Sequence, residues 1–299
     1  MNETLRRTIL YGSGAVFTLG LIYAGFIYPK TVHADPGTLL GIAELNIGYA
    51  ERLNSSGAGE KIHKFREERL REAEKRLDEV EMIMPGLAIT REMRGFADWV
   101  REDFEGAERW YRETLKVCGD DEALKAKTRM NLAEILIIRK KAKEALQILE
   151  AVGESRRDTR WYLVNSRAHN QLGQIEAREA SWKTAFEKAG KDIEKKKYCG
   201  DVVAEWDRDK ALSSYESISK KDVYTFYRIS SLKISGGEPD SAGDALRRAA
   251  SLNKRVLACL IRRDRAFWDK WDKEGMWKGI LQGGAEGNAK ADPKANPGR

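Results

Sequence analysis

Few residues of this chain have the type and spacing that catalysis or metal binding requires. The three histidines, His33, His63 and His169, are far apart, and none belongs to an HExxH pair or lies near cysteines at metal-site spacing. The sequence contains no phosphate-binding glycine loop, no dinucleotide fingerprint and no GxSxG nucleophile elbow. We therefore predict no catalytic residues, no metal site and no cofactor.

The acidic residues and cysteines give no chemical site either. Close pairs of Asp and Glu fall in stretches such as residues 61–81, where charges of both signs alternate at helical spacing and indicate a solvated helix face. Cys118, Cys199 and Cys259 are odd in number and widely separated, so we expect three small buried residues without a disulfide. An enzyme with an unfamiliar helical active site, such as an envelope hydrolase, is kept as an alternative.

The elements that would position any site are helices. Residues 129–152 form the clearest unit, two short helices joined by a basic turn. Ala133 and Ala145 lie twelve positions apart, one on each helix, where small residues allow two antiparallel helices to approach closely. Leu149 and Val152 follow on the same helix face as Ala145 and would fill the next groove.

Similar units recur along most of the chain. Each unit has an anchor residue on its second helix, and the anchors are Ala73, Ala107, Ala145, Trp182, Ala211 and Ala242. Successive anchors are separated by 34, 38, 37, 29 and 31 residues. This period, with small residues at two offsets and a larger residue four positions after the second, resembles the tetratricopeptide repeat (TPR). The resemblance covers residues 38–270, although the family's early Trp is missing from every copy and its closing Pro appears only as Pro85. An irregular all-α domain without repeat ancestry is the alternative.

The resemblance implies an all-α solenoid of five to six helix pairs over residues 38–281, ending in a capping helix. Phe267, Trp268, Trp271 and Trp277 would cover the exposed end of the stack. Residues 282–299 are rich in Gly, Ala and Pro and are predicted to be a disordered tail.

A different prediction applies to the N-terminal residues. After a short tail, residues 1–7, the segment 8–28 contains no charged residue and would span about 31 Å as a helix, the thickness of a bilayer. We predict a transmembrane helix there, followed by a linker at residues 29–37. Because Arg6 and Arg7 precede the segment, the N-terminus would be cytoplasmic and the repeat domain would lie on the periplasmic-type side. Cleavage as a signal peptide after Ala34 is the alternative.

The resemblance also implies a binding groove, because the first helices of TPR units line a concave face that binds peptides. Carrying that family's groove positions across residue by residue gives Phe96, Trp99, Lys127, Asn131, Arg167, Lys196, Lys197, Tyr224 and Arg228. Such a basic, partly aromatic groove would suit an acidic or extended segment. The family's carboxylate clamp requires Lys and Asn in the copy before Lys127 and Asn131, and Glu92 and Phe96 stand there instead.

The net charge of +7 is compatible with anionic membranes, acidic partners or nucleic acid. The basic residues are dispersed among acidic ones and lack the interleaved aromatics of a nucleic-acid module, so we predict no nucleic-acid partner.

Together these features predict a membrane-anchored, non-enzymatic TPR-like scaffold that binds a protein or peptide segment on its concave face. A secreted form released after Ala34 is the remaining alternative.

Overall fold

The computed structural model describes residues 35–54, 60–271 and 279–281, and it contains no β-strand within those ranges. The all-α fold class is therefore confirmed for the described part of the chain. The helices are α2 (Pro36–Asn54), α3 (Glu60–Ile83), α4 (Ala88–Arg101), α5 (Phe104–Val117), α6 (Glu122–Ile138), α7 (Ala142–Glu150), α8 (Thr159–Gln171), α9 (Ile175–Ala189), α10 (Ile193–Val203), α11 (Arg208–Glu216), α12 (Val223–Ser235), α13 (Pro239–Arg263) and α14 (Arg265–Trp271).

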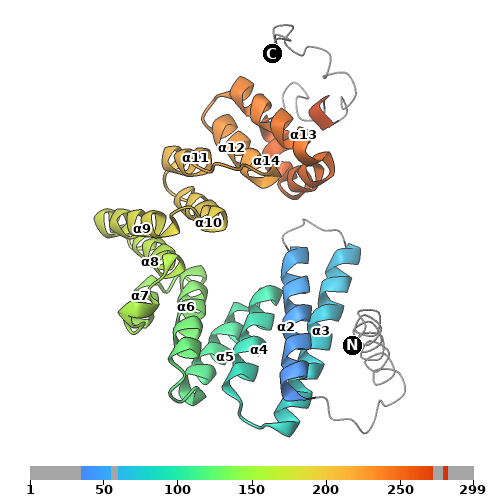
Figure 1. Ribbon diagram of the computed structural model, residues 1–299, viewed down its shortest axis with the longest axis vertical. Coiled ribbons are helices and arrows are strands. Elements are labelled where there is room, and N and C mark those ends of the chain that lie inside the picture. The colour runs from blue at the N-terminus through green and yellow to red at the C-terminus, as the bar shows by residue number, and fades with distance from the viewer. Residues whose placement is uncertain (1–34, 55–59, 272–278, 282–299) are drawn as a thin grey trace, which may run out of the picture.

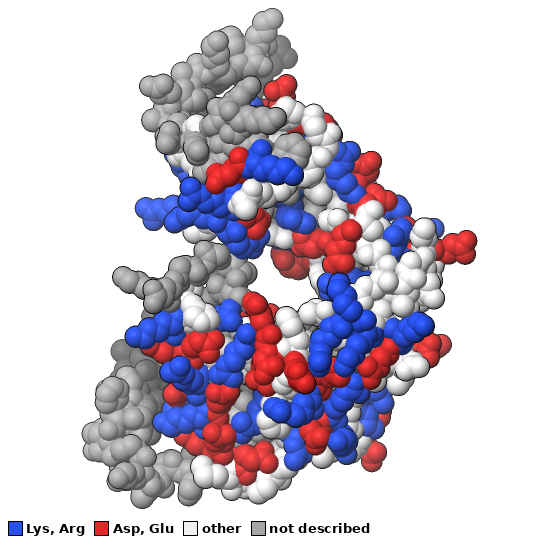
Figure 2. All heavy atoms as spheres, turned by 180° about the vertical axis from the view of Figure 1, so that it is seen from behind, with Lys and Arg blue, Asp and Glu red and all other residues white. Residues whose placement is uncertain are grey.

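The described helices from α2 to α13 form six consecutive pairs, α2 with α3 through α12 with α13. Each pair from α4–α5 onward also packs its first helix against the second helix of the pair before it. The stack curves, so that the first and last pairs lie at the two ends of an arc (Figure 1). Seen from behind, the molecule is correspondingly hollowed in its middle (Figure 2).

Aspartates start many of these helices. The side chain of Asp103 accepts the backbone N–H of Gly106 at the beginning of α5, and Asp158 accepts that of Trp161 at the beginning of α8. The same N-cap is made at α6, α10, α11 and α12 by Asp121, Asp192, Asp207 and Asp222. Each carboxylate satisfies a backbone donor that the helix leaves free, which fixes where the chain turns into the next helix.

The small residues of the repeat occupy the core. Ala107, Ala145, Ala211 and Ala242 are completely buried, and so are the larger residues four positions later, Tyr111, Leu149, Tyr215 and Leu246. The fourth unit differs, because Trp182 is only half-buried and Ala185 and Ala189 take the buried positions in α9.

Two glycines show how closely the paired helices approach. A Cβ added at Gly95 of α4 would lie 2.7 Å from Tyr111 Cε1, and one at Gly200 of α10 would lie 2.9 Å from Tyr215 Cε2. Residues 192–221 are hard to interpret from sequence alone, and Gly200 there is expected to interrupt a helix. The structure corrects this expectation, because Gly200 lies inside α10 and makes room for the tyrosine ring of α11.

One cysteine also differs from expectation. Cys118 and Cys199 are buried as predicted, but Cys259 is exposed on α13. Asn253 has non-helical backbone angles and kinks α13, so the segment that carries Cys259 departs from the direction of the first part of the helix. Further along, α14 places Trp268 in the core against Tyr227, with ring centroids 5.7 Å apart.

The terminal predictions fall mostly outside the described residues. These ranges leave out residues 1–34, and with them the predicted tail 1–7, the predicted membrane helix 8–28 and most of the linker 29–37, as well as the predicted tail 282–299. Within the described ranges, no helix combines the length and the apolar character needed to cross a bilayer. The single-pass membrane localisation predicted from the sequence is corrected on this finding.

Candidate binding groove

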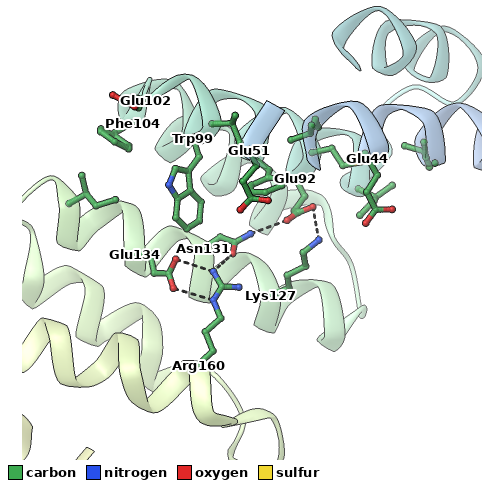
Figure 3. A pocket seen from close by; sticks show the side chains of 18 of the residues that line it. Glu44, Glu51, Glu92, Trp99, Glu102, Phe104, Lys127, Asn131, Glu134 and Arg160 are labelled. Atoms are coloured by element: carbon green, nitrogen blue, oxygen red, sulfur yellow. Dashed lines mark hydrogen bonds and ion pairs between the residues drawn. The ribbon is translucent and has the colours of Figure 1, made fainter. Parts of the chain in front are cut away.

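The concave side of the stack carries a groove of about 990 Å³. It is lined by residues of α2, α4, α6, α8 and α10, which are the first helices of the first five pairs, together with Glu102 and Phe104 between α4 and the start of α5. Figure 3 shows the part between α2, α4, α6 and α8, where side chains from all four helices converge. Each of these first helices also packs against the second helix of its own pair.

Aromatic side chains on α4 and α5 form one side of the groove, and they are the apolar contact surface that it offers. Phe96 and Trp99 pack edge to face with ring centroids 6.2 Å apart, and Phe104 lies at the start of α5. All three are half-buried, so part of each ring faces the open space. The indole of Trp99 points toward Asn131 and Glu134 on the opposite side (Figure 3).

A buried carboxylate organises the polar side of the groove. Glu92 of α4 is 1% exposed, and its Oε1 accepts a hydrogen bond from Asn131 Nδ2 at 3.0 Å. Its Oε2 lies 3.1 Å from Lys127 Nζ, one helical turn earlier on α6. Lys127 and Asn131 are therefore held by the chain's own carboxylate.

Arg160 of α8 extends this network across the next interface. Its guanidinium donates to both oxygens of Glu134 at 3.1 Å and to Asn131 Oδ1 at 2.7 Å. The hydroxyl of Tyr198 on α10 donates to Glu134 at 3.2 Å. Burial disfavours the charge of Arg160, but the Glu134 carboxylate outweighs that effect and raises the pKa of the guanidinium. Four successive first helices are thus linked by charged hydrogen bonds.

The remaining predicted groove residues lie in two different parts of the structure. Arg167 lines the groove with Phe96, Trp99, Lys127 and Asn131, and it pairs with Glu205 at 2.9 Å. The other four predicted residues do not line this groove, namely Lys196, Lys197, Tyr224 and Arg228.

Those four residues make contacts with neighbouring helices and loops instead. Lys197 pairs with Asp222 at 2.7 Å and with Glu194 at 2.8 Å, and Lys196 Nζ lies 3.4 Å from Ser217 Oγ. Asp201 of α10 accepts from the Tyr224 hydroxyl at 2.9 Å and pairs with Arg228 at 2.9 Å. The contacts with Asp222 and Asp201 connect the fifth and sixth helix pairs, whereas those with Glu194 and Ser217 stay within the fifth pair. The four residues stay a prediction as partner-binding positions.

The groove also contains residues that the sequence does not single out. Glu44 and Glu51 of α2 line it, as do Glu134, Arg160 and Tyr198. Its carboxylates are Glu44, Glu51, Glu92, Glu102 and Glu134, against three cations, Lys127, Arg160 and Arg167. The basic groove expected from the sequence is therefore not what the structure shows, because each of these three cations is already paired with a carboxylate of the chain.

Chemically, this arrangement offers contact surface and fixed charges. The described residues contain no group of His, Cys, Asp and Glu side chains that could hold a metal ion. Tyr215 and Tyr224, the tyrosines nearest Asp201, have their pKa raised by burial and then by the carboxylate, so they stay protonated phenols.

Comparison with known proteins supports the fold. No family model matches the sequence, and no curated protein matches it significantly. Among solved structures, a tetratricopeptide repeat protein from Parabacteroides merdae ATCC 43184 is similar with a TM-score of 0.50 and 16% identity, over 74% of this chain and 85% of that one. At this identity the likeness shows a TPR-like helical fold and nothing about function.

Two further solved structures match with lower TM-scores. YrrB, a TPR protein with an unusual peptide-binding site, has a TM-score of 0.36 and 17% identity over 63% of this chain and 97% of its own. NprR in complex with its cognate peptide NprX has a TM-score of 0.42 and 14% identity over 94% of this chain and 86% of its own.

Proposed function

We propose that this chain is a non-enzymatic scaffold that binds an extended segment of a protein partner in the concave groove. The observation that carries the proposal is the groove itself, about 990 Å³ in volume and lined by half-buried aromatic side chains. That volume lies at the upper end of the range of roughly 300–1,000 Å³ for ligand pockets. The groove runs across several first helices, as an extended ligand requires.

The frame around the groove is fixed before a ligand arrives. Glu92, Asn131, Arg160 and Glu134 join α4, α6 and α8 through buried, charge-assisted hydrogen bonds. Charge-assisted bonds are roughly twice as strong as neutral ones, and they hold the helices at a defined separation. A preformed groove lowers the ordering cost of binding, which favours recognition of a flexible segment.

Aromatic side chains supply the expected binding energy. Trp and Tyr, together with Arg, are enriched among the residues that dominate interfaces, and the two aromatic residues bury a large rigid surface. Trp99 presents such a surface inside the groove (Figure 3), and Phe96 packs against it. We expect Trp99 to contribute more than any other single residue.

Selection from a random peptide library tests this function on the full chain. Peptides that bind the wild-type protein should lose about tenfold or more in affinity when Trp99→Ala is introduced. Ile175→Ala is the matched control, because Ile175 is a 62% exposed residue on a second helix, outside the groove. The proposal would be contradicted if no peptide were selected, or if the selected peptides bound the Trp99→Ala variant unchanged.

A further inference from the structure

Among the described residues, the groove charges without an ion pair are all carboxylates, two on α2 and one, Glu102, between α4 and α5. Glu44 and Glu51 of α2 are exposed, line the groove, and form no ion pair or hydrogen bond with other described residues. The groove cations are in the opposite situation, since Lys127 is paired with Glu92, Arg160 with Glu134 and Arg167 with Glu205. A ligand therefore meets uncompensated negative charge along α2.

The aromatic surface lies on α4, which packs against the helix that carries these carboxylates. Glu51 reaches into the groove on the side of Trp99 and Glu92 (Figure 3), and Phe96 packs against Trp99. A cation near Trp99 would be attracted by the face of the indole as well as by the carboxylate. Apolar contact and negative charge are thus combined in one stretch of the groove.

The spacing of the two carboxylates matches an extended chain. Glu44 and Glu51 are seven residues apart on α2, two turns of helix, so they lie on the same face at a separation of about 10 Å. A segment in the extended polyproline II conformation has three residues per turn and rises about 3.1 Å per residue, so two side chains three positions apart lie on one face at a similar distance.

We propose that the α2–α4 end of the groove binds a cationic segment, in which two Lys or Arg side chains about three positions apart pair with Glu44 and Glu51 while a neighbouring apolar residue packs on Trp99. This inference rests on the proposed function, because it identifies the charge of the segment that the groove takes. It reverses the acidic ligand expected from the sequence, and the reason is that the internal carboxylates have already neutralised the groove cations.

Binding of designed peptides to the full chain tests the proposal. The probes are three fluorescein-labelled peptides of identical Leu, Phe, Ser and Gly content that carry two lysines, two glutamines or two glutamates three positions apart. The lysine peptide should bind most tightly and the glutamate peptide least, and the preference should shrink as salt is added. Fluorescence anisotropy measures each dissociation constant.

Variants then assign the preference to the two carboxylates. Glu44→Gln combined with Glu51→Gln should weaken the lysine peptide by about five- to tenfold and leave the glutamine peptide unchanged. Glu176→Gln combined with Glu187→Gln is the matched control, because these two exposed residues lie on α9, outside the groove. This control should retain the wild-type preference.

The possible outcomes separate this proposal from the proposed function. Equal binding of the three peptides, or a preference that survives in the Glu44→Gln, Glu51→Gln variant, would overturn the charge proposal. Failure of all three peptides to bind would also overturn it. None of these three results would overturn the binding function, which depends on whether library-selected peptides need Trp99.

Discussion

Asn131 of α6 donates a hydrogen bond from Nδ2 to the buried carboxylate of Glu92 on α4, at 3.0 Å, across 39 residues of sequence. Lys127 approaches the other carboxylate oxygen at 3.1 Å. In the family that the sequence resembles, a Lys and an Asn at these positions would belong to a clamp for a ligand carboxylate. Here an internal side chain occupies that position, so the two residues join neighbouring repeats.

Replacing this carboxylate should therefore destabilise the protein. Asn131 and Lys127 each donate to one oxygen of the Glu92 carboxylate. Glu92→Gln replaces one of these acceptor oxygens with an amide NH2 group, which leaves a buried donor without an acceptor. We expect a loss of about 1–3 kcal/mol in the free energy of unfolding, measured by urea denaturation followed by circular dichroism. Glu105→Gln is the control, because Glu105 is an exposed residue of α5, and it should change stability by less than about 0.5 kcal/mol. Identical urea midpoints for Glu92→Gln and wild type would show that the contact contributes no stability.

The close approach of α4 and α5 gives a second prediction. Gly95→Ala should destabilise the protein although Ala is the better helix former, because the new Cβ would lie 2.7 Å from the fully buried ring of Tyr111. The clash should outweigh the gain of about 1 kcal/mol in helix propensity and lower the melting temperature. Gly41→Ala in α2 is the matched control with no atom within 4 Å of its new Cβ, and it should raise the melting temperature. A higher melting temperature for both variants would refute the predicted clash between the new Cβ and Tyr111.

The helix pairs could be predicted because their signal is local. Ala133 and Ala145 are twelve positions apart and report that two helices must approach closely, and both are completely buried in the structure. Gly95 could likewise be placed at a close approach of two helices, because it lies twelve positions before Ala107. Gly200 could not, because a glycine in a lysine-rich stretch looks like a helix breaker until its neighbour Tyr215 is known.

The charge of the groove could not be predicted because its signal is not local. Lys127 and Arg167 look like free cations in the sequence, but their partners are 35 and 38 positions away, at Glu92 and Glu205. The contact of Tyr198 with Glu134 spans 64 positions. Such pairs depend on how successive repeats are rotated against one another, and the repeat period does not specify that rotation. The glutamates of α2 could not be predicted as groove residues, because the positions carried over from the family begin in the second copy, at Phe96.

A third prediction concerns acid stability. Burial would raise the pKa of Glu108, but hydrogen bonds from Arg112 and Lys141 outweigh it and hold the pKa below the ordinary value of 4.5. A carboxylate with a lower pKa in the folded state stabilises the protein above its unfolded pKa, and this contribution disappears as pH falls through the folded value. Glu108→Gln should therefore be less stable than wild type near neutral pH, and the difference in unfolding free energy should shrink below about pH 4.5.

Urea denaturation at several pH values measures that difference. Arg139 also contacts Glu108, at 2.6 Å, and Lys141 lies 3.1 Å away, so the carboxylate joins α5 to the turn between α6 and α7. Glu105→Gln on the same helix should stay close to wild type at every pH. A difference between Glu108→Gln and wild type that is constant with pH would mean that ionisation of Glu108 does not stabilise the fold.

The three cysteines should differ sharply in reactivity. Cys259 is exposed, whereas Cys118 and Cys199 are buried. Burial raises the pKa of the Cys199 thiol to about 12, so at about pH 8 it is both inaccessible and almost entirely protonated. Ellman's reagent should therefore detect one rapidly reacting thiol in the folded protein and all three thiols in concentrated guanidinium. Cys259→Ser should abolish the rapid phase, and Cys199→Ser should leave it intact. A rapid phase that persists in Cys259→Ser would show that a cysteine of the repeat core is open to solvent, contrary to the packing of α5 and α10.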